Sequence, residues 1–362
     1  MMTLTIDTLH VPESVDAPDA GEWRAYIEVI NASYRHDAGT DLLEWDPAVM
    51  LAAMHQQSHR VRLAYLARDG GSVVGAGELT FDRSTERDVE FMVAVAPGAR
   101  GRGIDDAICA RLEDEARALG RSYALVYAPT PVDADTLPSD AVLRPSSGAG
   151  GVPRDDERSR MLLARRYALG QVERASAYAL DADPDPLRAR LDAAQTAAGD
   201  EYETVWWSDR APDAYIDGYA AAIARMGTDV PSGDHDWEPE VWDAERIRAR
   251  EDRAASTGQL WGVTIVVHRP TGVVAAFNEL VLSPDRAKPT ENYGTLVVPE
   301  HRGRRLGTIV KCLGLLRWRE VAPDSPAVVT FNAEENRHML DVNEAVGFRP
   351  VFWEGSWHTH LS

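Results

Sequence analysis

Two short segments rich in arginine and glycine carry the strongest chemical signal in this sequence. One of them reads Val297-Val298-Pro299-Glu300-His301-Arg302-Gly303-Arg304-Arg305-Leu306-Gly307. It joins a β-branched run to an amphipathic helix that we expect to begin at about Thr308. A strand, loop and helix in this order point free backbone N–H groups at one place, where the helix dipole adds partial positive charge. The pattern therefore predicts a binding site for a phosphate or pyrophosphate.

The same sequence pattern occurs 202 positions upstream, as Val95-Ala96-Pro97-Gly98-Ala99-Arg100-Gly101-Arg102-Gly103-Ile104-Asp105. Proline aligns with proline and Arg-Gly-Arg with Arg-Gly-Arg. The hairpins before the two loops also match, with Glu78 aligned to Glu279. Repetition of this kind indicates two copies of one unit.

The elements that must position these loops follow the same order in each copy. In the first copy we expect strands over 4–9, 61–68, 73–81, 90–96, 123–128 and 171–180, and helices over 22–36, 47–57, 104–119 and 158–169. In the second we expect strands over 202–207, 261–268, 273–282, 291–298, 327–332 and 348–357, and helices over 212–224, 240–256, 308–320 and 334–346. The Pro/Gly/Ser-rich stretch 129–153 reads as an insertion. We expect domains over 1–180 and 187–362, joined by a linker over 181–186.

Composition limits the classes of partner. The formal net charge is −20, which argues against nucleic acid and against an anionic membrane as partners. It favours cationic substrates, or serves solubility alone. No apolar run approaches the roughly 18 residues of a membrane helix, and the first residues lack the features of a secretory signal. Two cysteines without a paired spacing fit a reducing compartment, so we expect a cytoplasmic protein.

A late helix adds a second motif, Asn336-Arg337-His338-Met339-Leu340-Asp341-Val342-Asn343-Glu344-Ala345-Val346-Gly347-Phe348. Together with the loops it resembles the GNAT superfamily of acyl-CoA-dependent N-acyltransferases. That family carries Arg/Gln-x-x-Gly-x-Gly/Ala before one helix and Asn-x-x-Ala-x-x-x-Tyr-x-x-x-Gly-Phe on a later one. The resemblance implies an α/β (α+β) fold of two tandem GNAT-like domains, each a mixed, mostly antiparallel, splayed sheet flanked by helices.

The resemblance implies acetyl-CoA as acyl donor and no metal. The loop amides would hold the pyrophosphate of coenzyme A, and an exposed strand edge would pair with its pantetheine arm. The residues implied to bind the donor are Leu296, Val297, Val298, Arg302, Gly303, Arg304, Arg305, Leu306, Gly307, Thr308, Asn332 and Asn336. No His/Cys cluster has the spacing of metal ligands.

The first loop departs further from the family pattern than the second. Asp105 stands where glycine or alanine is usual, and a carboxylate there would repel a pyrophosphate. The matching late helix also lacks the family's Asn, Ala and Tyr. We therefore expect the first domain to be non-catalytic, either as a packed scaffold or as a weaker second CoA site formed by Val95, Arg100, Gly101, Arg102, Gly103 and Ile104.

Direct attack on a thioester needs a base, because an ammonium has no lone pair. Glu291, eight residues before the loop proline, is our first candidate, and Glu279 on the neighbouring strand is the second. Asn343 replaces the tyrosine that serves many relatives as general acid. Asparagine supplies no proton near neutral pH, but its amide can hydrogen-bond the sulfur.

The segment 225–243 is rich in carboxylates and tryptophan. Asp234 and Trp237, with Glu279, would suit a cationic amine through ion pairing and cation–π contact; the alternative is a solvated acidic loop anchored by its tryptophans. We predict a monomeric or homodimeric N-acetyltransferase that moves acetyl from acetyl-CoA to a small-molecule amine by direct attack. The alternatives are a non-catalytic acyl-CoA-binding sensor or scaffold, and a protein or peptide N-acetyltransferase.

Overall fold

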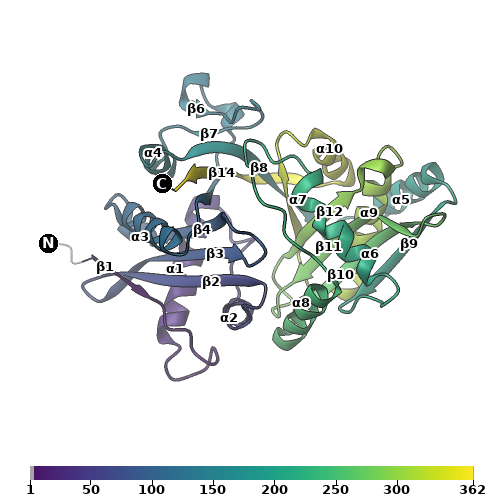
Figure 1. Cartoon of the computed structure of the whole chain (residues 1–362). Coiled ribbons are helices and arrows are strands. Elements are labelled where there is room, and N and C mark those ends of the chain that lie inside the picture. Colours follow the sequence, from purple (N-terminus) through teal and green to yellow (C-terminus); the bar gives the residue numbers. More distant parts are fainter. Residues whose placement is uncertain (1–3, 362) are drawn as a thin grey trace.

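A single sheet of twelve strands runs through both halves of the chain, in the order β1-β2-β3-β4-β5-β14-β8-β13-β12-β11-β10-β9 (Figure 1). The computed structural model describes residues 4–361. The first half consists of β1 (Leu4–Thr8), α1 (Gly21–Ala38), α2 (Pro47–His55), β2 (Arg60–Asp69), β3 (Ser72–Asp82), β4 (Asp88–Val95), the 3-10 helix η1 (Pro97–Ala99), α3 (Ile104–Ala118), β5 (Tyr123–Thr130), η2 (Ala134–Thr136), η3 (Ser139–Ala141), β6 (Val142–Leu143), β7 (Val152–Pro153), α4 (Glu157–Ala164) and β8 (Ala168–Ala179).

The second half repeats this order. It consists of α5 (Asp185–Ala198), β9 (Tyr202–Ser208), α6 (Ile216–Ala224), α7 (Met226–Asp229), α8 (Ala244–Thr257), β10 (Leu260–His268), β11 (Val273–Leu282), β12 (Thr290–Val297), η4 (Pro299–His301), α9 (Leu306–Val321), β13 (Ala327–Ala333), α10 (Arg337–Val346) and β14 (Arg349–His360). The α/β fold of two tandem, mostly antiparallel units flanked by helices is confirmed.

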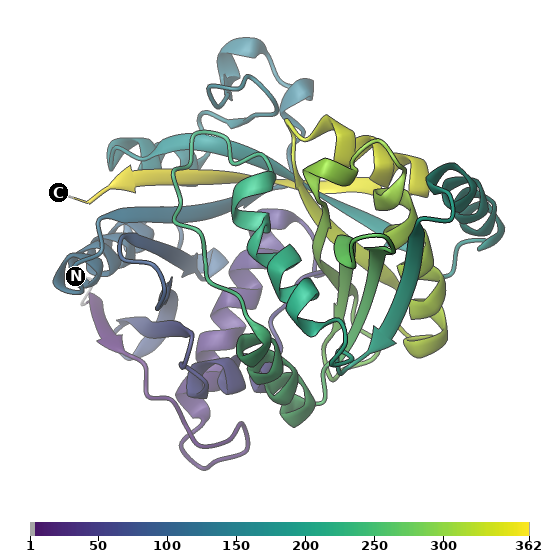
Figure 2. The ribbon, with the colours of Figure 1, turned by 45° about the vertical axis from the view of Figure 1, so that its right-hand side comes forward.

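The two halves exchange their last strands. β14, from the end of the chain, pairs with β5 of the first half, and β8 pairs with β13 of the second. β14 and β8 also pair with each other, so the sheet has no break between the halves. Figure 2 shows β14 (yellow) crossing beside β8 (teal) to the side of the first half. The division of the chain into two domains at 181–186 stays a prediction. The sheet itself is continuous and contains strands from both halves.

Each half buries apolar side chains on both faces of the sheet. α3 illustrates how the sequence does this: Ile104, Ile108, Leu112 and Ala116 recur every four residues and are almost completely buried against the strands. α9 and α5 cover the same face in the second half. α1 and α2 cover the opposite face in the first half, and α6 and α8 cover it in the second.

Several expected elements differ from the structure; the helices expected over 212–224 and 240–256, for example, begin at Ile216 and Ala244. The helix expected over 158–169 ends at Ala164, because Arg166 takes a left-handed conformation with φ of 66° and the chain turns into β8. The expected linker instead runs into α5, whose Pro186 lies in the first turn, where a helix tolerates proline. None of the helices within residues 4–361 is both long and apolar enough to span a lipid bilayer.

Candidate active site

The second arginine-rich loop presents unengaged hydrogen-bond donors at the start of α9. Within residues 4–361, the N–H groups of Gly303, Arg304 and Arg305 donate to no acceptor, and the side chains of both arginines have no polar partner. The guanidinium of Arg302 is fixed by backbone carbonyls, including that of Asp229 at 2.8 Å. The first turn of α9 carries no acidic residue. The loop and the helix dipole therefore leave a positive site open to an anion.

One residue of this loop has a strained backbone. Arg305 has φ of 61°, in the left-handed region, which costs a side-chain-bearing residue about 1 kcal/mol. Gly103 takes the equivalent place in the first loop with φ of 72° and without that cost. Strain of this kind persists where function requires it. Arg305 is therefore a candidate for a side-chain contact with the bound anion.

The first loop is filled by groups of the protein itself. Glu157, at the start of α4, accepts a hydrogen bond from the N–H of Gly101 at 2.7 Å. Arg100 and Arg102 are both paired with aspartates. Asp105 adds a buried carboxyl to the first turn of α3. An anionic ligand at this loop would meet the carboxylates of Asp105 and Glu157, and both loop arginines are already paired.

The halves also differ where two parallel strands separate. β12 pairs with β13 only through Thr290–Asn292, so the rest of β12 has a free edge. The register of β11 and β12 shifts between Glu279 and Leu280, which leaves Tyr293 as the extra residue of a β-bulge. β3 and β4 pair without a shift. Bulges often lie beside active sites, because they re-aim the neighbouring side chains.

Glu291 and Glu90 hold the same position on β12 and β4, but their surroundings differ. Glu90 is paired with Arg60. Glu291 has no basic partner in the described part of the chain, and the protein around it raises its pKa to about 7. Glu291 itself is exposed to solvent. A carboxylate with these properties is suited to accept a proton near neutral pH.

Two further carboxylates lie at the centre of the sheet, where the exchanged strands meet. Glu354 on β14 is directly opposite Glu173 on β8. Burial raises the pKa of Glu173 to about 7, with repulsion from Glu335 added, and that of Glu354 to about 8, with repulsion from Glu173 added. Neither Glu173 nor Glu354 has a basic partner among the described residues. The charges of both Glu354 and Glu291 also raise the pKa of Tyr34, after the larger effect of its burial.

The three asparagines implied by the family resemblance are used differently. Asn336 caps α10, and its side chain accepts from the N–H of Met339 at 3.3 Å. The buried Asn343 donates to the side-chain oxygen of Asn332. The oxygen of Asn343 has no hydrogen-bond partner within residues 4–361. A buried amide oxygen without a partner is rare in proteins, so Asn343 can accept a hydrogen bond from a ligand.

Glu279 has its carboxylate engaged. It is 3% exposed, Arg250 donates to it at 2.7 Å, and the hydroxyl of Tyr219 donates to the same oxygen. Its counterpart in the first half, Glu78, is bound by an arginine and a tyrosine in the same way. The shared cluster stabilises both halves. Of our two candidate bases, Glu291 is the one whose carboxylate is available.

A cavity of about 640 Å³ lies between the halves. Its walls come from β2, β3 and β4 on one side and from α6, α8, β11 and β12 on the other. Trp237, Glu279 and Tyr293 line it. The coil between α7 and α8 crosses from the second half to the first along one side of the cavity (Figure 2). Asp234 does not line this cavity, and its carboxylate accepts from Ser146 instead.

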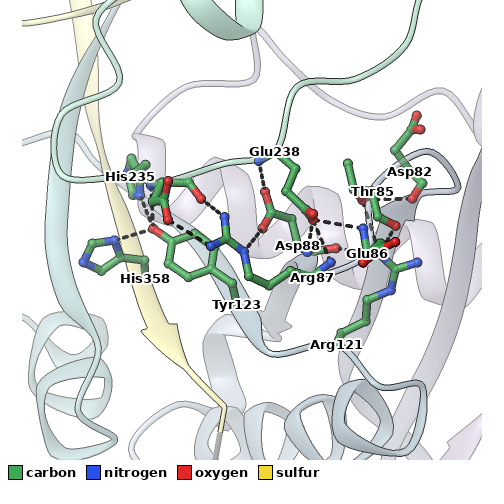
Figure 3. Close-up of polar contacts among 11 residues, drawn as sticks. Asp82, Thr85, Glu86, Arg87, Asp88, Arg121, Tyr123, His235, Glu238 and His358 are labelled. Atoms are coloured by element: carbon green, nitrogen blue, oxygen red, sulfur yellow. Dashed lines mark hydrogen bonds and ion pairs between the residues drawn. The ribbon is translucent and has the colours of Figure 1, made fainter.

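Carboxylates fasten this coil to the first half (Figure 3). Glu238 accepts from the backbone N–H groups of Glu86, Arg87 and Asp88 at 2.6–3.2 Å. His235 packs beside His358, and burial first and the neighbouring histidine second lower its pKa to about 4. The acidic groups of this segment thus serve mainly as anchors, which favours the structural interpretation of its composition.

A buried lysine was not singled out by the sequence analysis. Lys311 lies one turn after Gly307 on the same face of α9, is 1% exposed, and donates to Asn292 at 2.9 Å. It has no carboxylate partner in the part of the chain described, and burial lowers its pKa to about 7. The sequence offered one signal for it: Lys311 follows Gly307 by four residues, a spacing that places both on the same face of a helix.

The bulge at Tyr293 also had a sequence signal. Glu279 follows Glu78 by 201 positions, whereas Pro299 follows Pro97 by 202. One residue has therefore been added between hairpin and loop in the second half, and the structure places it at Tyr293.

Comparison with known proteins agrees with this geometry. The model of the acetyltransferase (GNAT) family matches residues 23–143. A tandem GNAT protein from the clavulanic acid biosynthesis pathway superposes with a TM-score of 0.74 at 21% identity, covering 99% of each chain. A GCN5-related N-acetyltransferase from Sphaerobacter thermophilus superposes with a TM-score of 0.58 at 13% identity, covering 99% of this chain and 96% of the other. No curated protein sequence gives a match. Residues 23–143 thus match the acetyltransferase (GNAT) family, and the chain has the fold of the tandem GNAT protein over its whole length.

Proposed function

We propose that this protein is an N-acetyltransferase that transfers the acetyl group of acetyl-CoA to the amine of a small molecule, and that its second half carries the chemistry. One observation supports this most strongly. The open, positive loop at Gly303–Arg305 leads to a splayed, bulged strand that carries the unpaired carboxylate of Glu291.

The residues of the second half fit coenzyme A. The free N–H groups and arginines at the start of α9 suit its pyrophosphate. The edge of β12 beyond Asn292 has no partner strand and suits the amides of the pantetheine arm. The orphaned oxygen of Asn343 suits an N–H group of the same arm. Bound there, the thioester supplies the activated acyl group.

The protein's own part in the reaction is proton transfer and positioning. Glu291 takes a proton from the acceptor's ammonium, so that the nitrogen has a lone pair with which to attack the acyl carbon. The new C–N bond forms as the C–S bond breaks; the nitrogen gives its second proton to water, and the thiolate leaves and takes a proton from water. Asn343 lacks an acidic proton and does not protonate the leaving group; its free oxygen accepts from an N–H of the pantetheine arm and so orients the thioester.

The enclosed cavity between the halves favours a small acceptor over a protein. A volume of about 640 Å³ is within the usual range for small-molecule sites, about 300–1,000 Å³. The coil anchored by Glu238 borders it, which leaves little room for a folded partner.

An assay of thiol release from acetyl-CoA tests the proposal. We expect release that depends on an added small amine and an acetylated amine in equal amount by mass spectrometry. Lysine-rich peptides should be poor acceptors by comparison. Acetyl-CoA binding in calorimetry without amine-dependent release across a broad panel would favour a non-catalytic sensor, and efficient peptide acetylation would favour a protein acetyltransferase.

A further inference from the structure

The cavity between the halves contains a row of arginines from α8. Arg246, Arg250 and Arg253 lie at positions i, i+4 and i+7, so they share one face of the helix, and all three line the cavity. Arg246 is paired with Asp82 and Arg250 with Glu279, both at 2.7 Å. The third arginine differs.

Arg253 has no carboxylate partner among residues 4–361. Its guanidinium donates to the side-chain oxygen of Gln56 at 2.9 Å. Burial lowers the pKa of Arg253, and the like charges of Arg62, Arg250 and Arg246 lower it further. In a protein of net charge −20, a crowded arginine without a counter-charge is costly unless an anion arrives.

Tyr293 lines the cavity together with these arginines and follows Glu291 by two positions on β12. It is 60% exposed. Burial raises the pKa of its hydroxyl, and the charge of Glu291 raises it further. The charges of Arg62, Arg253 and Arg250 act in the opposite direction. Tyr293 therefore lies between Arg253 in the cavity wall and Glu291 on the same strand.

We propose that the acceptor is a small amine that also carries a carboxylate, as an amino acid does, and that Arg253 binds this carboxylate while the amine faces Glu291. This inference rests on the proposed function, because it assigns the acceptor of that same site. A planar guanidinium pairs with a carboxylate through two parallel hydrogen bonds. The unpaired carboxylate of Glu291 attracts the ammonium of the same molecule.

The assignment gives the unpaired Arg253 in the cavity wall a counter-charge. An amine with a second cationic group would meet Arg253 with like charge, and an uncharged amine would leave it without a counter-charge. The carboxylate takes no part in the bond changes. It fixes the distance of the amine from Glu291, which makes Arg253 a positioning and specificity residue.

Arginine labelling tests the binding step without relying on catalysis. Phenylglyoxal is applied to the intact protein, and modification of Arg253 is followed by peptide mass spectrometry. We expect protection by amines of two to six carbons that carry a carboxylate, and none by the corresponding carboxamides or by linear diamines. The exposed Arg317 on α9 should be labelled equally in all samples. Equal labelling of Arg253 with and without the carboxylated amines overturns the inference, and so does stronger protection by 2-aminoethyl phosphate.

Kinetics separate this inference from the proposed function. Arg253→Gln should raise KM for carboxylated amines by about 10- to 100-fold, the loss expected for one charge-assisted hydrogen-bonded pair, with kcat little changed. KM for the carboxamides should stay the same, and the control Arg317→Gln should behave as the unaltered protein. Equal turnover of carboxylated amines and carboxamides by the unaltered protein would overturn the inference while leaving acetyl transfer intact. Absence of all transfer, with Arg253 still protected, would instead overturn the proposed function.

Discussion

The first and second halves place the same elements around the same kind of loop, but they treat that loop differently. In the first half, Glu157 occupies the N–H of Gly101, and the loop arginines are paired with aspartates. In the second half the equivalent N–H of Gly303 and the arginines beside it have no partner within residues 4–361. The two loops therefore keep the same backbone arrangement but differ in which of their donors are already engaged.

The family match shows the same separation of fold from site. The GNAT model matches residues 23–143, which lie in the half whose loop is closed. This half keeps the buried pattern of α3 and the tyrosine–glutamate–arginine cluster around Glu78. Those features determine packing. The features to which we assign the proposed chemistry, a loop with unengaged donors and an unpaired carboxylate, lie in the second half.

The largest effect should come from replacing Glu291 with glutamine, compared with the same replacement at the equivalent Glu90. Glu291→Gln removes the carboxylate but keeps the shape, so we expect kcat to fall by about 100- to 1,000-fold, as for loss of a general base. Because burial raises the pKa of Glu291 to about 7, kcat/KM of the unaltered protein should rise with pH through about 7. Below that pH the protonated carboxyl accepts no proton.

Steady-state kinetics of both variants across pH 5–9 checks this. Glu90→Gln should keep most of the activity and the same rise of kcat/KM with pH, since Glu90 is already paired with Arg60. The assignment fails if Glu291→Gln retains the limb near pH 7, or if the two variants lose activity equally.

The next effect concerns donor binding at the two loops. Gly307→Asp gives the second loop the acid that the first carries as Asp105. We expect the Kd for acetyl-CoA to rise by about 100-fold or more, because a like charge in a binding site costs several kcal/mol. Calorimetric titration measures it.

The reciprocal variant Asp105→Gly should leave the affinity and a stoichiometry of one unchanged, because Glu157 still fills the first loop. Unaltered binding in Gly307→Asp would move the donor to the first half, and our assignment of the catalytic half would be wrong.

A stability difference should follow from Lys311, whose place in the first half is taken by the uncharged Cys109. The pKa of Lys311 is lowered from its ordinary 10.5 to about 7 by burial. Below pH 7 it is charged in the folded and unfolded states, so the full cost of burying the charge is present. As pH rises from about 7 to 10.5 that cost disappears.

Lys311→Met should therefore raise the free energy of unfolding by about 2–4 kcal/mol at pH 6 and by less at pH 9. Thermal melts at both pH values measure this. A variant that is less stable at pH 6 than the unaltered protein would show that the hydrogen bond to Asn292 outweighs the buried charge.

The sequence predicted the repeat, the loops and most elements, because those depend on local patterns such as the aligned Pro97 and Pro299. The exchange of β8 and β14 was not predictable, since the composition of a strand does not specify which strand it pairs with. The closure of the first loop was missed because Glu157 lies 56 residues after Gly101. α5 was missed although Leu187, Leu191 and Ala194 show helical spacing, because the prolines before them resemble a linker.

The smallest expected effect comes from replacing Arg305, and it distinguishes the backbone strain at this residue from its contact with the ligand. Arg305→Gly gives the second loop the residue that the first has at Gly103, and it removes both the left-handed strain and the guanidinium. We expect the free energy of unfolding to stay the same or to rise by up to about 1 kcal/mol, because glycine adopts φ of 61° without strain. We expect the Kd for acetyl-CoA to rise about 5- to 10-fold and to depend less on salt, because one charge-assisted contact is lost.

Gly103→Arg should show the strain alone, with lower stability and no new binding. If Arg305→Gly binds acetyl-CoA as tightly as the unaltered protein, the strain at Arg305 has no role in donor binding, and the backbone N–H groups suffice to explain the open loop.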